Sequence, residues 1–540
     1  MHRTPALLAP ALAVLVLTVG LAVGCTQPSG STGTAAPAAG PPKPQGELVV
    51  ALAEFTRGEA WDPSQGILLS NLQGLLFESL YLHWPPEGES RTFLLESASM
   101  APDALSWTFK LRDGIRFSNG EPMTADDVKF SLERYMSDAS RTQAAGTFRK
   151  SVQKVEVLDK LSFRMLLKEP LLTLPSLFSG KRSAEGIVMP KRYVEQVGWD
   201  TFNQKPIGSG PYQLVEHKLG QSATFEPVPN HWRTTPMFEK VRALLVPEEQ
   251  TRIAMLSTGQ ADLIRVGPGS VDQIKRSGFT PIQIAYGAAW RAYLYGALKG
   301  YPENPLQKLE VRKAITLAVG KKAMLDSLYD GRGEVAAYGH SAPGVSLGAP
   351  KGLAPPPYDP AQARQLLQQA GYPNGFPITI FAIQGGSGCD DQQMKNFSSA
   401  LASDWQKIGL QPTIRPIDFA VFRPLYAGAR HAPETIGNVS LFCNPGNAVA
   451  LDDLAATYWS KGLVKTSDVA DAEIERAQAA KSQEELVTWS EAAYRKLYEN
   501  YSTLTFFHGS LVYAANKKLG DIPVTAGFDN LFMWFTYARP

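Results

Sequence analysis

The chain has 540 residues, a formal net charge of +2, and the glycine, proline and aromatic content of an ordinary folded protein. This length is enough for two or three domains with large cores. Because the charge is close to neutral and no basic stretch with interleaved aromatic residues is present, the composition argues against a nucleic-acid-binding protein.

The first 25 residues have the pattern of a lipoprotein signal peptide. Arg3 supplies a positive charge, and an apolar run over residues 6–23 ends in small residues before Cys25. Cys25 would carry the lipid and become the mature N-terminus. The competing interpretation is a plain transmembrane anchor, because the run approaches spanning length. Residues 26–46 are mostly Ser, Thr, Ala, Gly and Pro, which predicts a flexible tether.

Short apolar segments separated by turns follow the tether. Residues 48–52 form an apolar run, which predicts a strand buried on both faces, and residues 68–82 have helical spacing. Residues 107–111 alternate between apolar and polar side chains, and 115–117 resume the alternation after an Asp-Gly turn. That pattern predicts a β-hairpin. Two further alternating runs within 152–167 predict a second hairpin.

A capped helix is predicted after the first of these hairpins, because Thr124 is followed three residues later by Asp127, as in a capping box. The stretch over 107–135 reads WTFKLRDGIRFSNGEPMTADDVKFSLERY. It closely resembles the signature segment of family 5 extracytoplasmic solute-binding proteins, the peptide, dipeptide and nickel receptors of ABC importers. Ser118 stands where that family commonly has a histidine.

Further segments resemble the same family in the same order. Residues 206–212 read PIGSGPY, close to the family's PVGTGPY. A phosphate-binding interpretation is disfavoured, because no Lys-Ser or Lys-Thr pair follows and the next element has the pattern of a strand. Residues 311–315 read VRKAI, and residues 358–376 match the family's YDP…AGYPNGF segment almost word for word.

The second part of the chain predicts a parallel sheet. Residues 377–382 and 411–417 have the pattern of strands, and 393–408 between them has that of an amphipathic helix, so this β-α-β order implies parallel strands. Residues 289–298 are predicted to be an extended segment that crosses between lobes. Residues 502–507 are predicted to be the strand that returns to the first lobe.

The resemblance covers residues 47 to about 520 and implies an α/β protein with the two-lobed, type II architecture of periplasmic binding proteins. The implied boundaries are a leader over 1–25, a tether over 26–46, and lobe I over 47–290 with an extra subdomain at about 70–190. Lobe II would take 291–505, and 506–540 would return to lobe I, with a hinge between the lobes.

Two cysteines, Cys389 and Cys443, remain after Cys25. In an oxidising compartment such a pair is a candidate disulfide that closes a long loop. The alternative is two separately buried thiols, because sequence does not show the distance between them.

Ligands of doubly wound lobes bind outside the carboxyl ends of strands. Three loops answer that description, at 54–57, 384–391 and 442–447, together with the crossing segment near 290–293. The candidate ligand contacts are Glu54, Phe55, Arg57, Trp290, Arg291, Tyr293, Gln384, Ser387, Asp390, Asn444 and Asn447. For each of them a structural role is at least as strong an alternative, and for Asp390 a role at the start of a helix is favoured over ligand contact.

Peptide-binding members of the family anchor the peptide amino group with an aspartate. The comparable stretch here, 441–451, offers Asn444 and Asn447, and no aspartate occurs until Asp452 and Asp453. This departure argues against classical peptide binding and leaves a neutral or differently charged solute open. The sequence has no G-x-S-x-G elbow, no H-x-x-x-H pair and no C-x-x-C motif, so we expect no catalysis, cofactor or metal site.

The sequence therefore predicts a monomeric, lipid-anchored receptor outside the cytoplasm, in the periplasm or on the outer face of the cytoplasmic membrane. It would capture a small solute, peptide-like or other, and deliver it to the permease subunits of an ABC importer. Two alternatives remain open. One is a receptor that presents its closed form to a signalling partner, and the other is a secreted hydrolase, which the missing nucleophile motif disfavours.

Overall fold

The computed structural model describes residues 44–53, 55, 60–65, 72–84, 89–142, 144–179, 184–339, 341, 345–385, 389, 391–427, 430–444, 449–520 and 522. The predicted leader, Cys25 and most of the tether lie outside these residues. Within the described ranges, no helix has the length and apolar content needed to span a membrane.

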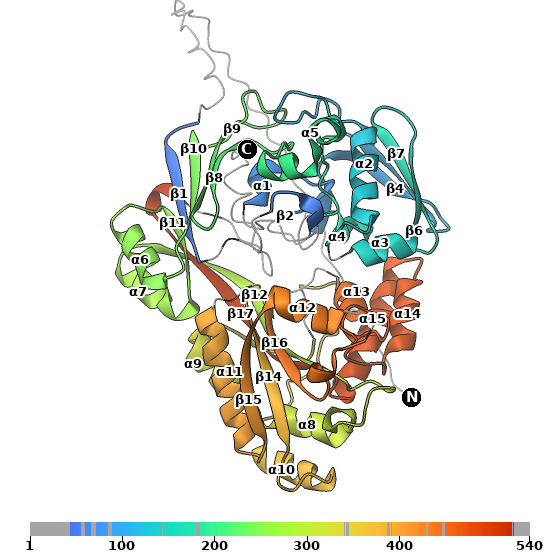
Figure 1. The fold of residues 1–540 in the computed structure, drawn as a ribbon, viewed down its shortest axis with the longest axis vertical. Helices are drawn as coiled ribbons and strands as arrows, with labels where there is room; N and C mark the ends of the chain where they lie inside the picture. The colour runs from blue at the N-terminus through green and yellow to red at the C-terminus, as the bar shows by residue number, and fades with distance from the viewer. Residues whose placement is uncertain are drawn as a thin grey trace, which may run out of the picture. The chain divides into compact units, whose positions relative to one another are not determined.

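One large mixed sheet runs through the folded part of the chain (Figure 1). Its strand order is β15-β14-β16-β12-β17-β11-β1-β10-β9-β8, and β13 lies beside β17. The bounds are β1 (Glu47–Leu52), β8 (Tyr212–Lys218), β9 (Ser222–Pro227), β10 (Lys240–Leu245), β11 (Leu263–Val266), β12 (Thr280–Leu294), β13 (Gly333–Val335), β14 (Pro377–Gln384), β15 (Gln411–Asp418), β16 (Val439–Asn444) and β17 (Leu504–Ala515).

The first part of the sheet, with the subdomain described below, is called lobe I. Here β1 lies between β10 and β11 and is parallel to both. Its side chains are buried on both faces, which confirms the prediction for residues 48–52. The apolar residues of one β1 face pack with α6 (Glu249–Ser257) and α7 (Val271–Arg276).

Strands β12 and β17 connect lobe I to the rest of the sheet. They pair antiparallel from Thr280 opposite Ala515 to Ala292 opposite Leu504, with register shifts between Ile284 and Ala288 and between Trp290 and Arg291. The first part of β12 lies beside the end of β17 that pairs with β11, and its last residues pair with β16. The extended crossing segment therefore exists, but it begins and ends earlier than the predicted residues 289–298, because β12 ends at Leu294.

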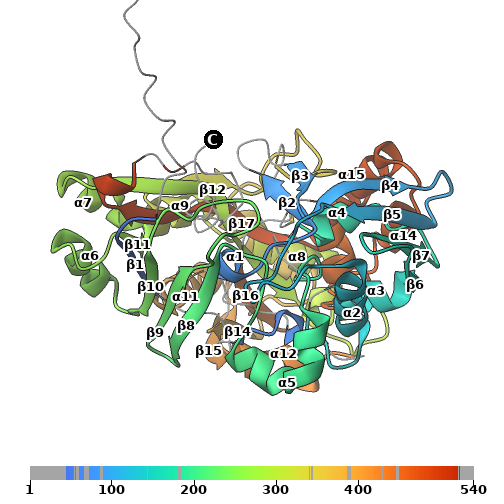
Figure 2. The same ribbon diagram turned by 90° about the horizontal axis from the view of Figure 1, so that it is seen from above.

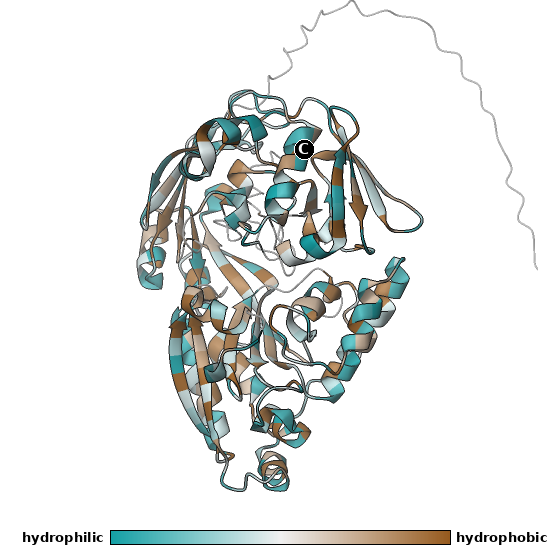
Figure 3. Ribbon diagram, turned by 45° about the vertical axis from the view of Figure 1, so that its right-hand side comes forward, coloured by the Kyte–Doolittle hydropathy of each residue, from teal (hydrophilic) through white to brown (hydrophobic). Residues whose placement is uncertain are grey.

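The second part of the sheet, with its helices, is called lobe II. Strands β14, β15 and β16 are parallel, and α11 (Asp391–Gln406) connects β14 to β15, which confirms the predicted β-α-β unit. The other helices are α8 (Leu309–Leu317), α9 (Lys321–Tyr329), α10 (Pro360–Gln369), α12 (Phe419–Ala427), α13 (Ala450–Asp453), α14 (Asp471–Gln478) and α15 (Gln483–Glu499). In Figure 3 hydrophobic residues concentrate on the strands, whereas the helices also carry hydrophilic residues.

The subdomain of lobe I is built on a separate antiparallel sheet of order β4-β5-β7-β6. Figure 2 shows it apart from strands β8 and β9 of the large sheet. Its elements are β4 (Leu95–Met100), β5 (Ser106–Leu111), β6 (Val152–Val157), β7 (Ser162–Leu167), α2 (Ala125–Met136), α3 (Ala145–Ser151), α4 (Leu174–Leu177) and α5 (Lys191–Gln204), beside the small pair β2 (Tyr81–Trp84) and β3 (Glu89–Thr92).

Two local predictions in this subdomain are confirmed. The backbone N–H of Thr124 donates to Asp127 Oδ2 at 2.8 Å, and the reciprocal contact completes a capping box at the start of α2. Strands β6 and β7 form the hairpin predicted over 152–167.

Two other local predictions are wrong. Residues 115–117 do not form the second strand of a hairpin, because only a single bridge joins Arg116 to Pro122, and proline has no N–H with which to extend a ladder. Strand β5 pairs with β4 and β7 instead. The helix expected over 68–82 is reduced, in its described part, to α1 (Gln73–Leu76), and β2 follows as a strand.

The PIGSGPY segment explains why α1 ends where it does. The N–H of Gly210 donates to the carbonyl oxygen of Leu76 at 2.9 Å. A Cβ on Gly208 would lie 2.1 Å from that same oxygen, and one on Gly210 would lie 2.5 Å from the carbonyl oxygen of Leu75. The glycines therefore permit a close backbone contact, which supports the structural interpretation of this motif.

Candidate functional site

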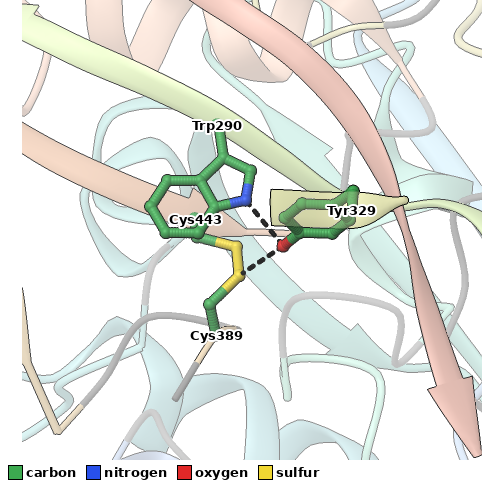
Figure 4. Close-up of a disulfide and its surroundings, with 4 residues drawn as sticks. All are labelled: Trp290, Tyr329, Cys389 and Cys443. Carbon is green, nitrogen blue, oxygen red and sulfur yellow. Dashed lines mark hydrogen bonds between the residues drawn. A yellow bond between two sulfur atoms is a disulfide. The ribbon is translucent and has the colours of Figure 1, made fainter. Parts of the chain in front are cut away.

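The carboxyl ends of β14 and β16 lie at one edge of the sheet, because the two strands are parallel. Cys389 follows β14 and Cys443 belongs to β16, and a disulfide with Cα atoms 5.7 Å apart joins them. The hydroxyl of Tyr329 accepts from Trp290 Nε1 at 2.6 Å and donates to Cys389 Sγ at 3.3 Å (Figure 4). The disulfide thus fixes two strand ends at the edge where ligands of such folds bind.

Strand β12 presents its side chains to two different environments. Trp290 is fully buried and stacks on Phe397 of α11 with ring centroids 4.2 Å apart. Its indole N–H is already used by Tyr329, so it serves the core on the α11 side of the sheet. Tyr293 packs on Phe442 at a centroid distance of 4.8 Å, in a separate apolar cluster that includes residues of α12.

A buried ion pair joins β12 to α13. Arg291 Nη1 lies 3.0 Å from Asp453 Oδ1, and the two side chains are 5% and 1% exposed. Asp453 also accepts from Thr457 Oγ1 at 3.1 Å and from Tyr494 Oη at 2.7 Å. Burial raises the pKa of Tyr494 well above its ordinary value, which keeps the hydroxyl a neutral donor. The first aspartates after the 441–451 stretch thus include one whose two oxygens both already accept from protein donors.

His508 of β17 lies near this ion pair and is also buried. Burial and the positive charge of Arg291 lower the pKa of His508 to about 4. The imidazole is therefore neutral at physiological pH, because protonation would place a second cation beside the guanidinium. In the described ranges no cluster of His, Cys, Asp and Glu has the arrangement of a metal site.

A cleft of about 1070 Å³ separates the subdomain from lobe II. One wall comes from residues 140–151 and 169–177, which include α3 and α4, and the other from α12, α13 and residues 455–463. In Figure 1, α3 and α4 face the group formed by α13, α14 and α15. A cleft of this size, lined by both apolar and charged side chains, can hold a small ligand.

Polar and apolar contacts between described residues cross this cleft, and Leu172 of the subdomain packs against the apolar cluster of lobe II. Ser176 Oγ donates to Asp452 Oδ2 at 3.4 Å, and Arg423 Nη2 approaches the carbonyl oxygen of Arg141 at 3.5 Å. Lys150 Nζ lies 5.1 Å from the ring centroid of Trp459. The two hydrogen bonds are long, so these polar contacts hold the two walls together only weakly.

The candidate ligand contacts from the sequence fall into three groups. Trp290, Arg291 and Tyr293 are buried as described, and Phe55 lies in the main apolar core. Gln384 and Asn444 are half-buried at the ends of β14 and β16. The remaining candidates lie outside the described residues, and they are Glu54, Arg57, Ser387, Asp390 and Asn447.

The structure therefore brings Asn444 and Cys443 beside β12, opposite Ala289 and Trp290. Sequence reasoning missed the charged residues of the cleft walls. No local pattern singles out Arg141, Lys150 or Arg423, because they become neighbours of the opposite wall only in the folded chain.

Glu185 supports one wall of the cleft from behind. Its carboxylate is buried, and Oε1 accepts from the N–H of Ala144 at 3.0 Å, next to residues that line the cleft. The second oxygen, Oε2, has no hydrogen-bond partner among the described residues. Burial raises the pKa of Glu185 from 4.5 to about 7.

Because the folded state holds this proton more tightly than the unfolded state, the free energy of unfolding should fall as pH rises from 4.5 to about 7. The loss should approach about 3 kcal/mol above that window. In Glu185→Gln this part of the pH dependence should disappear, so the variant should match the wild type at pH 4 and exceed it at pH 8. Urea unfolding at a series of pH values measures the difference.

The exposed Glu226→Gln is the matched control, since it removes a carboxylate from the surface of β9. It should leave the pH profile of the wild type unchanged. If Glu185→Gln and the wild type gave parallel profiles between pH 4 and pH 8, Glu185 would not be the group responsible.

The fold and the cleft define a class of protein, a two-lobed α/β binding protein. A family model described as "Bacterial extracellular solute-binding proteins, family 5 Middle" matches residues 90–465, which is more than half of the chain. The chain belongs to this family.

Two curated relatives are similar to this chain at low sequence identity. Heme-binding protein A of Haemophilus influenzae is 28% identical over 351 residues, which cover 61% of this chain and 62% of that protein. Di/tripeptide-binding protein 1 of Pseudomonas aeruginosa is 27% identical over 370 residues, which cover 64% of this chain and 66% of that protein. The matched regions thus span slightly less than two thirds of these relatives.

Solved structures confirm the fold. The periplasmic binding protein DppA from Helicobacter pylori, in complex with the peptide STSA, superimposes with a TM-score of 0.76 at 20% identity. The match covers 91% of this chain and 98% of that one. The two-lobed architecture predicted from the sequence is therefore confirmed over nearly the whole described chain.

Proposed function

We propose that this chain is the solute receptor of an ABC importer, which captures a small solute between its lobes and delivers it to membrane permease subunits. The observation that carries the proposal is the cleft of about 1070 Å³ whose walls come from both lobes. A solute bound there contacts both walls, and it therefore favours the closed arrangement over the open one. Family membership supports the same function.

Binding of this kind needs no covalent step, so the proposed protein is a receptor rather than an enzyme, and it works without a cofactor or metal. We also propose that it acts as a monomer. Its proposed location is outside the cytoplasm, anchored through a lipid on Cys25. The lipoprotein pattern of residues 1–25 supports this anchor. The proposed hinge is the irregular region of β12 and β17 near Ile284 and Ala288, where the ladder is interrupted.

The solute differs among relatives, which are named for heme and for di- and tripeptides, so kinship does not select one. Both oxygens of Asp453 already accept from Arg291, Thr457 or Tyr494, which supports a solute that does not depend on a free amino group for anchoring. Proposed further contacts lie at and beside the strand ends, and they are Glu54, Arg57, Gln384, Ser387, Asp390, Asn444 and Asn447.

We expect a ligand-dependent rise in the melting temperature of the full chain, purified in detergent, when it is screened against peptides, amino-acid derivatives, sugars and nickel chelates. The compound that binds should be recovered unchanged, and it should reduce the radius of gyration in small-angle X-ray scattering because the lobes close. Conversion of the compound to a product would contradict the receptor function, and so would the absence of a shift with every compound.

A further inference from the structure

The described walls of the cleft carry more positive than negative charge. The basic side chains that line it are Arg141, Arg149, Lys150, Arg423 and Lys461, and the acidic ones are Glu169 and Asp452. We propose that the solute bears a carboxylate, which Arg141 of lobe I and Arg423 of lobe II bind together. This inference rests on the proposed receptor function and names the chemical class of the solute.

The two lysines are already neutralised by neighbouring carboxylates. Lys150 Nζ lies 2.8 Å from Glu169 Oε1, and Lys461 Nζ lies 2.6 Å from Glu475 Oε1. A solute anion would have to compete with these carboxylates for either lysine. Each lysine and its carboxylate together carry no net charge, so the pair attracts an anion less than an arginine without a carboxylate partner does.

The three arginines differ from the lysines because their guanidinium groups contact backbone carbonyl oxygens. Arg141 Nη1 donates to the carbonyl oxygen of Asp138 at 3.2 Å, and Arg149 Nη1 donates to that of Ser137 at 3.1 Å. Arg423 Nη2 reaches the carbonyl oxygen of Arg141 at 3.5 Å. Among the residues that the structure describes, none of these guanidinium groups forms an ion pair with a carboxylate.

A guanidinium group has five N–H donors in a planar fork that matches a carboxylate. Among the described residues these arginines use few of their donors on the protein, which leaves donors for a ligand. Arg141 and Arg423 also come from opposite walls, so one carboxylate between them would accept from both lobes. Without an anion, two cations brought together on closing repel each other, and a bound anion removes that cost. Binding and closure would thus be coupled.

The acidic side chains of the cleft are less suited to a cationic solute. Glu169 Oε1 accepts from Ser151 Oγ at 2.8 Å in addition to its ion pair with Lys150. Asp452 accepts from Ser176 across the cleft. The rest of the lining includes large apolar side chains such as Leu171, Leu177 and Trp459, which suit an apolar body on the solute. The walls therefore favour an acid with an apolar portion.

The test uses pairs of N-acetyl dipeptides with apolar side chains. One compound of each pair has a free C-terminal carboxylate, and the other has a C-terminal amide. The two compounds of a pair differ only in the C-terminal group, a carboxylate in one and a neutral amide in the other, and acetylation removes the free amine. Titration calorimetry of the full chain in detergent, at low salt, should give dissociation constants at least about tenfold lower for the acids, because only they offer a carboxylate to the arginines.

Arg423→Met and Arg141→Met should each weaken binding of the acids by about tenfold and leave binding of the amides unchanged. Arg423→Lys should retain part of the preference, since it keeps the charge and loses the fork. Arg364→Met is the matched control, because Arg364 also donates to a backbone carbonyl, that of Lys407, and is exposed on α10 away from the cleft. Melting temperatures confirm that each variant is folded.

Equal affinity for acids and amides, or an unchanged acid preference in both Arg→Met variants, would overturn the inference and leave the receptor function in place. Binding of a sugar or another neutral solute in the thermal screen, with no binding of any acid, would do the same. If no compound of any kind bound, the result would contradict the receptor function itself and therefore also the carboxylate inference that rests on it.

Discussion

Asp453→Ala is expected to lower the free energy of unfolding by about 3–5 kcal/mol, because it leaves the guanidinium of Arg291 buried without a counter-ion. The carboxylate is 1% exposed and accepts hydrogen bonds from Thr457 and Tyr494 as well as from the arginine. All three donors lose their acceptor at once. Urea unfolding followed by circular dichroism measures the change.

Asp452→Ala is the matched control in the next position, since Asp452 is half-buried and its hydrogen bond to Ser176 is long, at 3.4 Å. It should cost less than about 1 kcal/mol. The pair Arg291→Met with Asp453→Leu should recover much of the loss, because it removes both buried charges together. A loss below 1 kcal/mol for Asp453→Ala would show that Arg291 finds another partner or water.

Replacing both cysteines of the disulfide by serine is the second change with a large expected effect. Cys389 and Cys443 are 54 residues apart in sequence, and a bridge closing a loop of that length stabilises a protein by about 4 kcal/mol through the entropy of the unfolded chain. The double variant should therefore unfold at a clearly lower urea concentration. Its binding of solute should also weaken, because the ends of β14 and β16 are no longer tied.

Reduction of the wild type with dithiothreitol provides the control, since it should bring the unfolding midpoint to that of the double variant. The double variant itself should not respond to the reductant. Equal midpoints for the oxidised wild type and the double variant would mean that the bridge constrains the unfolded chain little, or that the loops are held in place by their other contacts.

Local patterns predicted the elements that depend on near neighbours in the chain. The capping box at Thr124 and Asp127 and the β-α-β unit over 377–417 are of this kind. The errors arose where tertiary pairing decided the outcome. Pro122 prevents a ladder beside residues 115–117, and the backbone of Leu76 contacts the glycine segment instead of continuing a helix.

The site was less predictable, because a local sequence pattern does not show which side chains are buried or which distant residues become neighbours. Trp290 is an aromatic residue of the kind that often lines a binding cleft, but it lies on the face of β12 that packs against α11. Arg141 and Arg423 meet across 282 residues of sequence, and nothing near either residue signals the other. The cysteine pair was within reach of sequence reasoning, since the number of cysteines limits the alternatives.

The antiparallel pairing of β12 and β17 makes lobe II a unit that can be replaced by protein engineering. The chain enters lobe II along one of these strands and leaves it along the other, and the two are hydrogen-bonded neighbours. Lobe II is thus one uninterrupted length of polypeptide whose two ends lie side by side. Such a length can be exchanged between relatives as one segment, which would replace the lobe II wall of the cleft and leave lobe I unchanged.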